Sequence, residues 1–147
     1  MRIFHTTIQF KTKEELDFID LTDEIIAFVK KSQIKNGLVN IQCLHTSAAI
    51  FVNENEPLLF EDIKNHLERI APKTLKYNHD DFTIRTVNVC PGECVNGHSH
   101  CKAIHLATNV TLNLINGKLQ HGQYQRVLFA ELDGSRERKV QIQIIGT

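Results

Sequence analysis

The chain has 147 residues and a mass of 16.8 kDa, with 41% hydrophobic and 23% charged residues, which indicates one globular domain over residues 1–147. Its 17 Lys and Arg balance its 17 Asp and Glu, so it lacks the excess positive charge typical of proteins that bind nucleic acids. The sequence shows neither an apolar membrane-spanning run nor a signal-peptide pattern. We therefore expect a cytoplasmic protein that binds neither nucleic acid nor membrane.

The first half of the chain predicts two helices among short strands. Residues 2–11 are rich in β-branched and aromatic side chains and predict a strand, followed by a turn over residues 12–15. Residues 21–31 have the apolar spacing of a helix, with Asp20 or Thr22 as its N-cap. Residues 38–52 predict two short strands, and a second helix should follow up to residue 70, with Asn55 as its cap and Pro57 near its first turn.

The second half is β-rich after a long connection. Residues 73–97 are polar, with a candidate strand at 83–89, and residues 99–107 are short-helical or irregular. Three strands are expected at 110–114, 124–132 and 140–144, joined by turns at Asn116-Gly117 and Asp133-Gly134, where glycine supplies positive φ angles. The fold class is therefore α+β or mainly β, an antiparallel β-sandwich-like domain with two covering helices.

One cluster of polar residues, His45-Thr46-Ser47 and Asn53-Glu54, lies around the predicted end of a strand and the start of the second helix. An imidazole, a hydroxyl and a carboxylate could meet there around one cavity. The alternative is that these residues are a sheet surface and a helix-capping segment, which polar residues often form.

A second cluster contains Cys90, Cys94, His98, His100 and Cys101, with His79 some way before it. Thiols and imidazoles are ligands of zinc and other transition metals. The alternatives are buried cysteines that act as small hydrophobic residues beside surface histidines, or redox-active thiols.

A third cluster lies in the predicted hairpins near the C-terminus. Gly122 permits close approach of a ligand, Gln125 offers both a donor and an acceptor, and the Arg136 guanidinium could bind a phosphate or carboxylate. The same residues could equally form two turns and a surface ion pair.

Together these motifs resemble the YjbQ-like family, whose members are known as secondary thiamine-phosphate synthases. The motifs are, in chain order, His45-Thr46-Ser47-Ala48, Asn53-Glu54-Asn55, Tyr77-x-His79, Ser99-His100-x-Lys102, Gly117-x4-Gly122-x2-Gln125 and Leu132-Asp133-Gly134-x-Arg136. The resemblance covers nearly the whole chain. The chain departs from the family pattern at Ala107, Asn109, Gln123 and Tyr124. These departures bear on the identity of the substrate more than on the fold.

The resemblance implies a homotrimer with sites near subunit boundaries and a divalent metal, zinc in the first place or magnesium with a diphosphate substrate. It implies His45, His79 and His100 as metal ligands, with Glu54 as a general base and Asn53 as a positioning group beside His45 in the catalytic set. The side chains expected to bind the small-molecule substrate are Ser47, Lys102, Gln125 and Arg136.

Two functions are compatible with this pattern. The first is a metal-assisted transferase that acts on small phosphorylated substrates and releases pyrophosphate, with weak thiamine-phosphate synthase activity. The second is a non-enzymatic trimeric protein that binds a metal or a small anion, which the missing Gly-rich phosphate loop favours.

Overall fold

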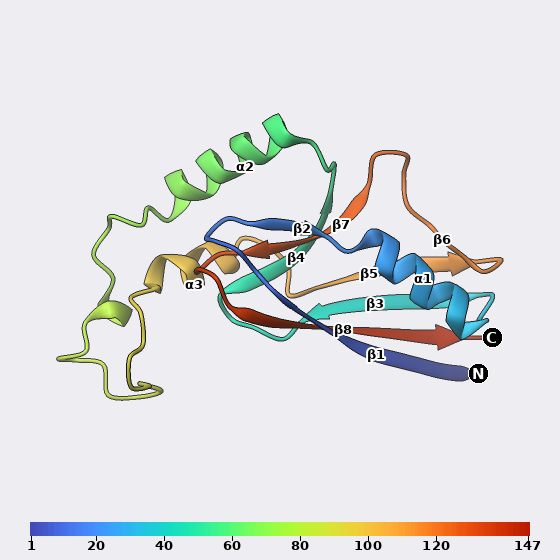
Figure 1. The fold of residues 1–147 in the computed structure, drawn as a ribbon, viewed down its shortest axis with the longest axis horizontal. Coiled ribbons are helices and arrows are strands. Elements are labelled where there is room, and N and C mark those ends of the chain that lie inside the picture. Colours follow the sequence, from blue (N-terminus) through green and yellow to red (C-terminus); the bar gives the residue numbers. More distant parts are fainter.

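The structure is a computed structural model that describes residues 1–147, and its body consists of two antiparallel sheets (Figure 1). The larger sheet has the strand order β1-β8-β3-β5-β6, and the smaller one has the order β2-β7-β4. The larger sheet contains β1 (Arg2–Lys11), β8 (Glu137–Gly146), β3 (Gly37–Cys43), β5 (Asn109–Ile115) and β6 (Lys118–Leu119). The smaller sheet contains β2 (Phe18–Asp20), β7 (Arg126–Glu131) and β4 (Ala48–Asn53).

Two helices cover the sheets, α1 (Thr22–Ser32) and α2 (Pro57–Ile70), which confirms the expected α+β class. A third helix, α3 (Gly97–Ala103), overlaps the short helical or irregular segment expected at residues 99–107, whereas a single 3₁₀ turn, η1 (Asn78–Asp80), was not expected. None of the helices has both the length and the apolar character needed to cross a membrane.

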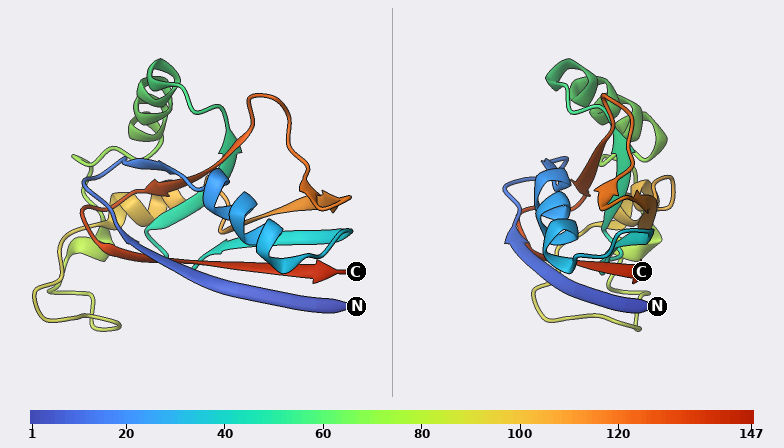
Figure 2. Two further views of the ribbon diagram at one scale, coloured as in Figure 1. Left: turned by 45° about the vertical axis from the view of Figure 1, so that its right-hand side comes forward. Right: turned by 90° about the vertical axis from the view of Figure 1, so that its right-hand side faces the viewer.

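The main core lies between α1 and the sheets. Alternate residues of β8 and β3 face inward, and the register pairs Ile142 with Ile41 and Ile144 with Val39. Helix α1 lies along this face, as both views of Figure 2 show, and it contributes Ile25 to the same cluster of 16 buried residues. The alternation that predicted these strands therefore reflects burial of one face of the sheet.

A smaller core joins α2 to the second sheet. It consists of Leu67 from α2 together with Ala49, Ala130 and Leu132. After α2 the chain leaves the body in a long connection, which projects at the lower left of Figure 1 before it returns to α3. The segment that returns forms the wall of the site described below.

Several details differ from the expectations. The N-cap of α1 is Leu21, and Asp20 instead accepts the Thr22 N–H in the preceding turn, while α2 is capped by Glu56 rather than Asn55. Residues 83–89 form turns and bends, not a strand. Positive φ angles occur at Asn116 and Gly117 as expected but not at Gly134.

Candidate functional site

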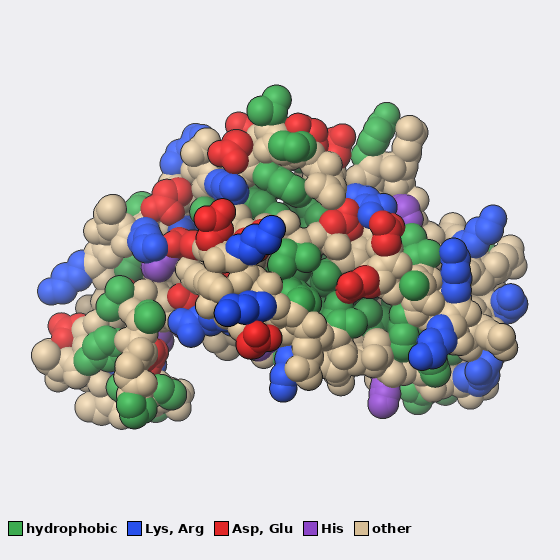
Figure 3. Space-filling model, in the orientation of Figure 1, with side chains coloured by type: hydrophobic (Ala, Val, Ile, Leu, Met, Phe, Trp, Pro, Cys, Tyr) green, Lys and Arg blue, Asp and Glu red, His purple; other side chains and the backbone are tan.

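A polar cavity of about 610 Å³ lies between the sheets and the connection from α2 to α3. Only 2 of its 15 lining residues are hydrophobic. The body contributes the segment after β3 and the turn between β7 and β8, and the connection contributes residues from His79 to Asn96. The connection is the projecting lobe at the lower left of Figure 3, and a notch separates this lobe from the body.

Two histidines lie together in this cavity. His79 comes from η1 and His100 from α3, and their ring centroids are 4.6 Å apart with an edge-to-face orientation. The Nε2 atom of His79 is buried and has no hydrogen-bond partner. Because a buried ring nitrogen without a partner is costly, this atom is available to bind a metal ion or a polar group of a ligand.

Asp80 brings these two histidines together. Its Oδ1 accepts the backbone N–H groups of Asn96 at 2.9 Å and Gly97 at 2.8 Å, which are at the start of α3. A side chain at position 97 would come within 2.6 Å of the Tyr77 Cβ, so only glycine permits this close packing of η1 on α3. Residues 79 and 100 therefore meet because the neighbour of His79 caps the helix of His100.

Three arginines line the same cavity, and each has an acidic partner. Arg85 pairs with Glu93 at 2.8 Å, and Arg136 pairs with Asp133 at 2.7 Å. Arg138 is buried against Glu131 and also donates to the Ser47 hydroxyl at 3.2 Å. A guanidinium has five N–H donors, so an arginine paired with one carboxylate can still bind an anion.

The environment keeps His100 neutral at pH 7. Burial lowers the pKa of His100 below 6.5, and the nearby His79 lowers it further, although Asp133 opposes this effect. A neutral imidazole can accept a proton or bind a metal ion. Asp133 is also fixed in place, because its Oδ2 accepts a hydrogen bond from the Asn96 side chain at 2.9 Å.

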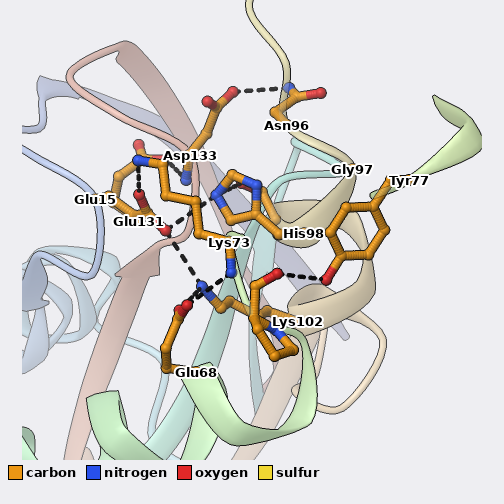
Figure 4. A network of polar contacts seen from close by, with 12 residues as sticks. Glu15, Glu68, Lys73, Tyr77, Asn96, Gly97, His98, Lys102, Glu131 and Asp133 are labelled. Atoms are coloured by element: carbon orange, nitrogen blue, oxygen red, sulfur yellow. Dashed lines mark hydrogen bonds and ion pairs between the residues drawn. The ribbon is translucent and has the colours of Figure 1, made fainter. Parts of the chain in front are cut away.

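A buried ionic network lies next to the cavity (Figure 4). The ammonium of Lys102 is fully buried and bonds to Glu68 at 2.6 Å and to Glu15 at 3.2 Å. Glu15 also pairs with Lys73 at 2.6 Å and with the buried ring of His98 at 3.0 Å. Lys102 and His98 therefore join α3 to the N-terminal segment and to α2, and neither lines the cavity.

The structure separates the expected site residues into groups. Ser47, His79, His100 and Arg136 line the cavity together, and Lys102 belongs to the network behind it. His45 does not line the cavity, and its Nε2 accepts the backbone N–H of Lys139 at 2.7 Å. Burial, and secondarily Arg138, lower the pKa of His45 below 6.5, which suits this acceptor role.

The remaining expected residues lie elsewhere. Asn53, Glu54 and Gln125 line a shallow hollow of about 330 Å³ beside the β6–β7 connection. Gln125 fixes that connection, since its Oε1 accepts the Gly122 N–H at 2.8 Å. The carboxylate of Glu54 and the His79–His100 pair thus belong to different hollows of the chain.

No three His, Cys, Asp or Glu side chains are arranged in the structure to hold a metal ion. The His79–His100 pair could supply two of the ligands of such an ion, because both rings line one cavity and the His79 Nε2 has no hydrogen-bond partner. Two imidazoles leave the other positions of a divalent metal to water or substrate. The ligand set of His45, His79 and His100 stays a prediction.

Sequence reasoning assigned no site role to several residues that line the cavity. Thr46, Asp133 and Arg138 lie within the recognised motifs or next to them. Their position in or beside these motifs is the sequence feature that could have identified them as site residues. Arg85 lies in the polar connection, where nothing in the sequence distinguishes it.

The fold and the cavity define a small α+β protein with a polar site between a β-rich body and one long connection. Residues 6–147 match the family model described as UPF0047 protein YjbQ-like. The chain belongs to this family, which confirms the resemblance in its motifs.

Known members are similar over almost the whole chain. A UPF0047 protein of Methanothermobacter thermautotrophicus is 32% identical over 99% of this chain and 94% of its own length. The UPF0047 protein YugU of Bacillus subtilis is 29% identical over 95% of this chain and 98% of its own. A crystal structure of a YbjQ-like protein of unknown function from Sulfolobus solfataricus has a TM-score of 0.83 and 28% identity, and it covers 99% of this chain and 100% of its own.

Proposed function

We propose that this protein is a small enzyme that acts on small phosphorylated compounds in the His79–His100 cavity. The observation that carries the proposal is the composition of the cavity wall, where two adjacent histidines face three arginines and few apolar groups. In this assignment Arg136, whose side chain is 41% exposed, binds the phosphate. His100, which is neutral at pH 7, accepts or donates the proton that the reaction moves.

The resemblance to secondary thiamine-phosphate synthases suggests the finer activity. In that reaction a hydroxymethylpyrimidine diphosphate is joined to a thiazole phosphate, and pyrophosphate leaves. Guanidinium groups of the cavity would neutralise the charge of the departing pyrophosphate. Lys102, also expected to bind phosphate, would need to leave its two carboxylate partners to do so, and we therefore assign that role to Arg136 first.

The test is turnover of a panel of phosphorylated substrates that includes this pair, measured for the wild type and for His100→Ala and Arg136→Gln. We expect His100→Ala to lower kcat/KM by about 100-fold or more, since removal of a proton-transfer group has this effect. Arg136→Gln should also lower kcat/KM, because the amide cannot replace the guanidinium that binds the phosphate. His66→Ala, at an exposed position of α2, is the control and should leave the rate unchanged. Saturable phosphate binding without any product would instead favour the non-enzymatic anion-binding function.

We further propose a divalent metal, with zinc the first choice, held by His79 and His100. Bound there, it would polarise a substrate oxygen or, as magnesium, accompany a diphosphate. Elemental mass spectrometry of untagged protein should give near-stoichiometric metal that His79→Ala removes. The same measurement on His45→Ala decides whether His45 belongs to the ligand set.

We also propose a homotrimer in which Asn53, Glu54 and Gln125 of one protomer face the cavity of another. This arrangement would unite residues that one protomer keeps in separate hollows. Ile3, Leu38 and Ile145 lie side by side on three paired strands and are 66%, 50% and 37% exposed, which suits contact with another copy. Light scattering should give three times the 16.8 kDa chain mass.

A mixing experiment tests the shared site directly. His100→Ala and Glu54→Ala proteins, each inactive, are unfolded together and refolded as a mixture. Activity should return in the mixture, because some interfaces then combine an intact His100 with an intact Glu54. A mixture as inactive as its components would show that the two residues do not act in one site across subunits.

A further inference from the structure

Residues 90–93 form a tight turn that begins at Cys90 and is followed directly by Cys94. The Cys90 carbonyl accepts the Glu93 N–H at 3.1 Å, and Pro91 and Gly92 lie between them. Gly92 has a φ of +73°, so Pro-Gly occupies the central positions of a type II turn. Such a turn brings its first and fourth Cα atoms within about 7 Å, and Cys94 follows the fourth residue directly.

Both thiols are free and exposed, and both residues line the His79–His100 cavity. The other two cysteines differ in environment. Cys43 is buried, its Sγ donates to the His45 carbonyl at 3.6 Å, and burial raises the pKa of its thiol. Cys101 is half-buried on α3 and does not line the cavity.

Arg85 and Glu93 hold this turn in place. The Glu93 carboxylate accepts the Cys90 N–H at 3.1 Å and pairs with Arg85 at 2.8 Å. Arg85 also donates to the Asn88 carbonyl at 2.6 Å and to the His79 carbonyl at 3.2 Å. The backbone at both ends of the turn is therefore fixed without any use of the two thiols.

We propose that Cys90 and Cys94 form an oxidative modification site, where a reversible intramolecular disulfide closes the turn. A disulfide needs Cα atoms about 4.4–6.8 Å apart. Cys94 is one residue beyond the position that the turn brings within about 7 Å of Cys90. This inference is independent of the proposed function, although the bond would form on the wall of the same cavity.

The oxidant is a low-molecular-weight disulfide of the glutathione type. One cysteine thiolate attacks a sulfur of this molecule, which breaks its S–S bond, releases one thiolate and leaves a mixed disulfide on the protein. The second cysteine thiolate then attacks the protein sulfur of that mixed disulfide and releases the other thiolate. The protein loses two hydrogens, and the small disulfide is reduced to two thiols.

The test treats the full folded chain with oxidised glutathione in the presence of EDTA, which removes any metal that would protect the thiols. Free thiols are then alkylated in denaturant, and the chain is cut by trypsin and by a protease specific for glutamate. These enzymes separate residues 86–93 from residues 94–102, because the cuts fall after Arg85, Glu93 and Lys102. We expect the two fragments to remain joined, lighter by two hydrogens, with alkylated Cys101, and to separate after dithiothreitol.

Three serine variants complete the test. Cys101→Ser should keep the link, whereas Cys90→Ser and Cys94→Ser should each lose it and carry one glutathione on the remaining cysteine of the turn. Separate glutathione groups on Cys90 and Cys94 in the wild type, without a link, would overturn the proposal. A link that persists in Cys94→Ser would also overturn it, because Cys101 would then be the partner.

Discussion

Glu131 and Arg138 form a pair of opposite charges that is almost completely removed from water, with side-chain exposures of 0% and 5%. The Glu131 carboxylate also accepts the Thr12 hydroxyl at 2.9 Å and the Asp133 N–H at 2.9 Å. A buried carboxylate with this many donors positions the residues that surround it. The pair thus supports the cavity wall from behind, since Arg138 in turn donates to Ser47.

Glu131→Gln should therefore destabilise the protein strongly. The substitution leaves the Arg138 charge buried without its partner, which costs about 3–5 kcal/mol. Urea unfolding followed by circular dichroism measures this loss. Glu61→Gln removes an exposed pair with Lys64 and should cost less than about 1 kcal/mol; equal losses in both variants would contradict the argument.

Asp20 should make the stability depend on pH in the acid range. Burial alone would raise its pKa, but hydrogen bonds from Arg126 and Thr22 outweigh this effect and lower the pKa from 3.8 to about 2. The folded state thus favours the ionised carboxylate. The resulting stabilisation is complete above pH 4 and disappears as the pH falls towards 2.

The size of this effect is on the order of 1–2 kcal/mol after allowance for solvent screening. The unfolding free energy of the wild type, measured at several pH values between 5 and 2, should fall more steeply than that of Asp20→Asn. Parallel curves for the two proteins would show that the Arg126 ion pair does not contribute to acid stability.

At the scale of single residues, sequence reasoning found site residues where a motif contained them. His79 and His100 were chosen from separate motifs, and the structure places their rings in contact. The pairing itself depends on Asp80 and Gly97, whose roles appear only when η1 packs on α3. The hydrogen bonds of Arg85 to the connection are likewise a product of the tertiary fold.

At the scale of elements, helix α2 begins with an unusual cap. The carboxylate of Glu56 accepts the N–H groups of Leu58 at 2.8 Å and Leu59 at 2.7 Å. Because Ser, Thr, Asp and Asn dominate at this position, the sequence favoured Asn55. That residue instead donates to Asp20 at 2.9 Å.

Glu56→Ala should cost about 0.5–2 kcal/mol of stability, the usual effect of losing a cap. Thermal unfolding of Glu56→Ala and of the matched variant Glu61→Ala, five residues further along α2, measures this cost. A smaller loss for Glu56→Ala than for Glu61→Ala would show that the cap contributes little.

Strands were predictable where alternation coincides with burial. The strand expected over residues 2–11 has the bounds of β1, and its alternate residues pack on the core. The apolar residues expected to form a strand at 83–89 include Ile84 and Val87, which are 62% and 69% exposed. Without a sheet to cover them, β-branched residues alone do not form a strand.

At the scale of the whole molecule, the arrangement of the two sheets depends on long-range pairing that local patterns do not contain. Strand β8, the last in the chain, lies between β1 and β3. The antiparallel sandwich-like class followed from the number and spacing of the strands. The order of the strands did not follow from the sequence patterns. The division of the expected site residues between two hollows, which results from that order, did not follow from them either.

The pairing of β1 with β8 also places the two chain ends together, since Arg2 lies opposite Gly146 (Figure 1). A short loop between residues 147 and 1 would turn these strands into an ordinary hairpin, and the chain could then be opened elsewhere. A circular permutant that starts at Gly92 should fold with the same circular dichroism spectrum as the parent. Both chain ends would then lie in the connection that forms one wall of the site. The architecture of this protein would thus be preserved although its elements follow one another in a different order along the chain.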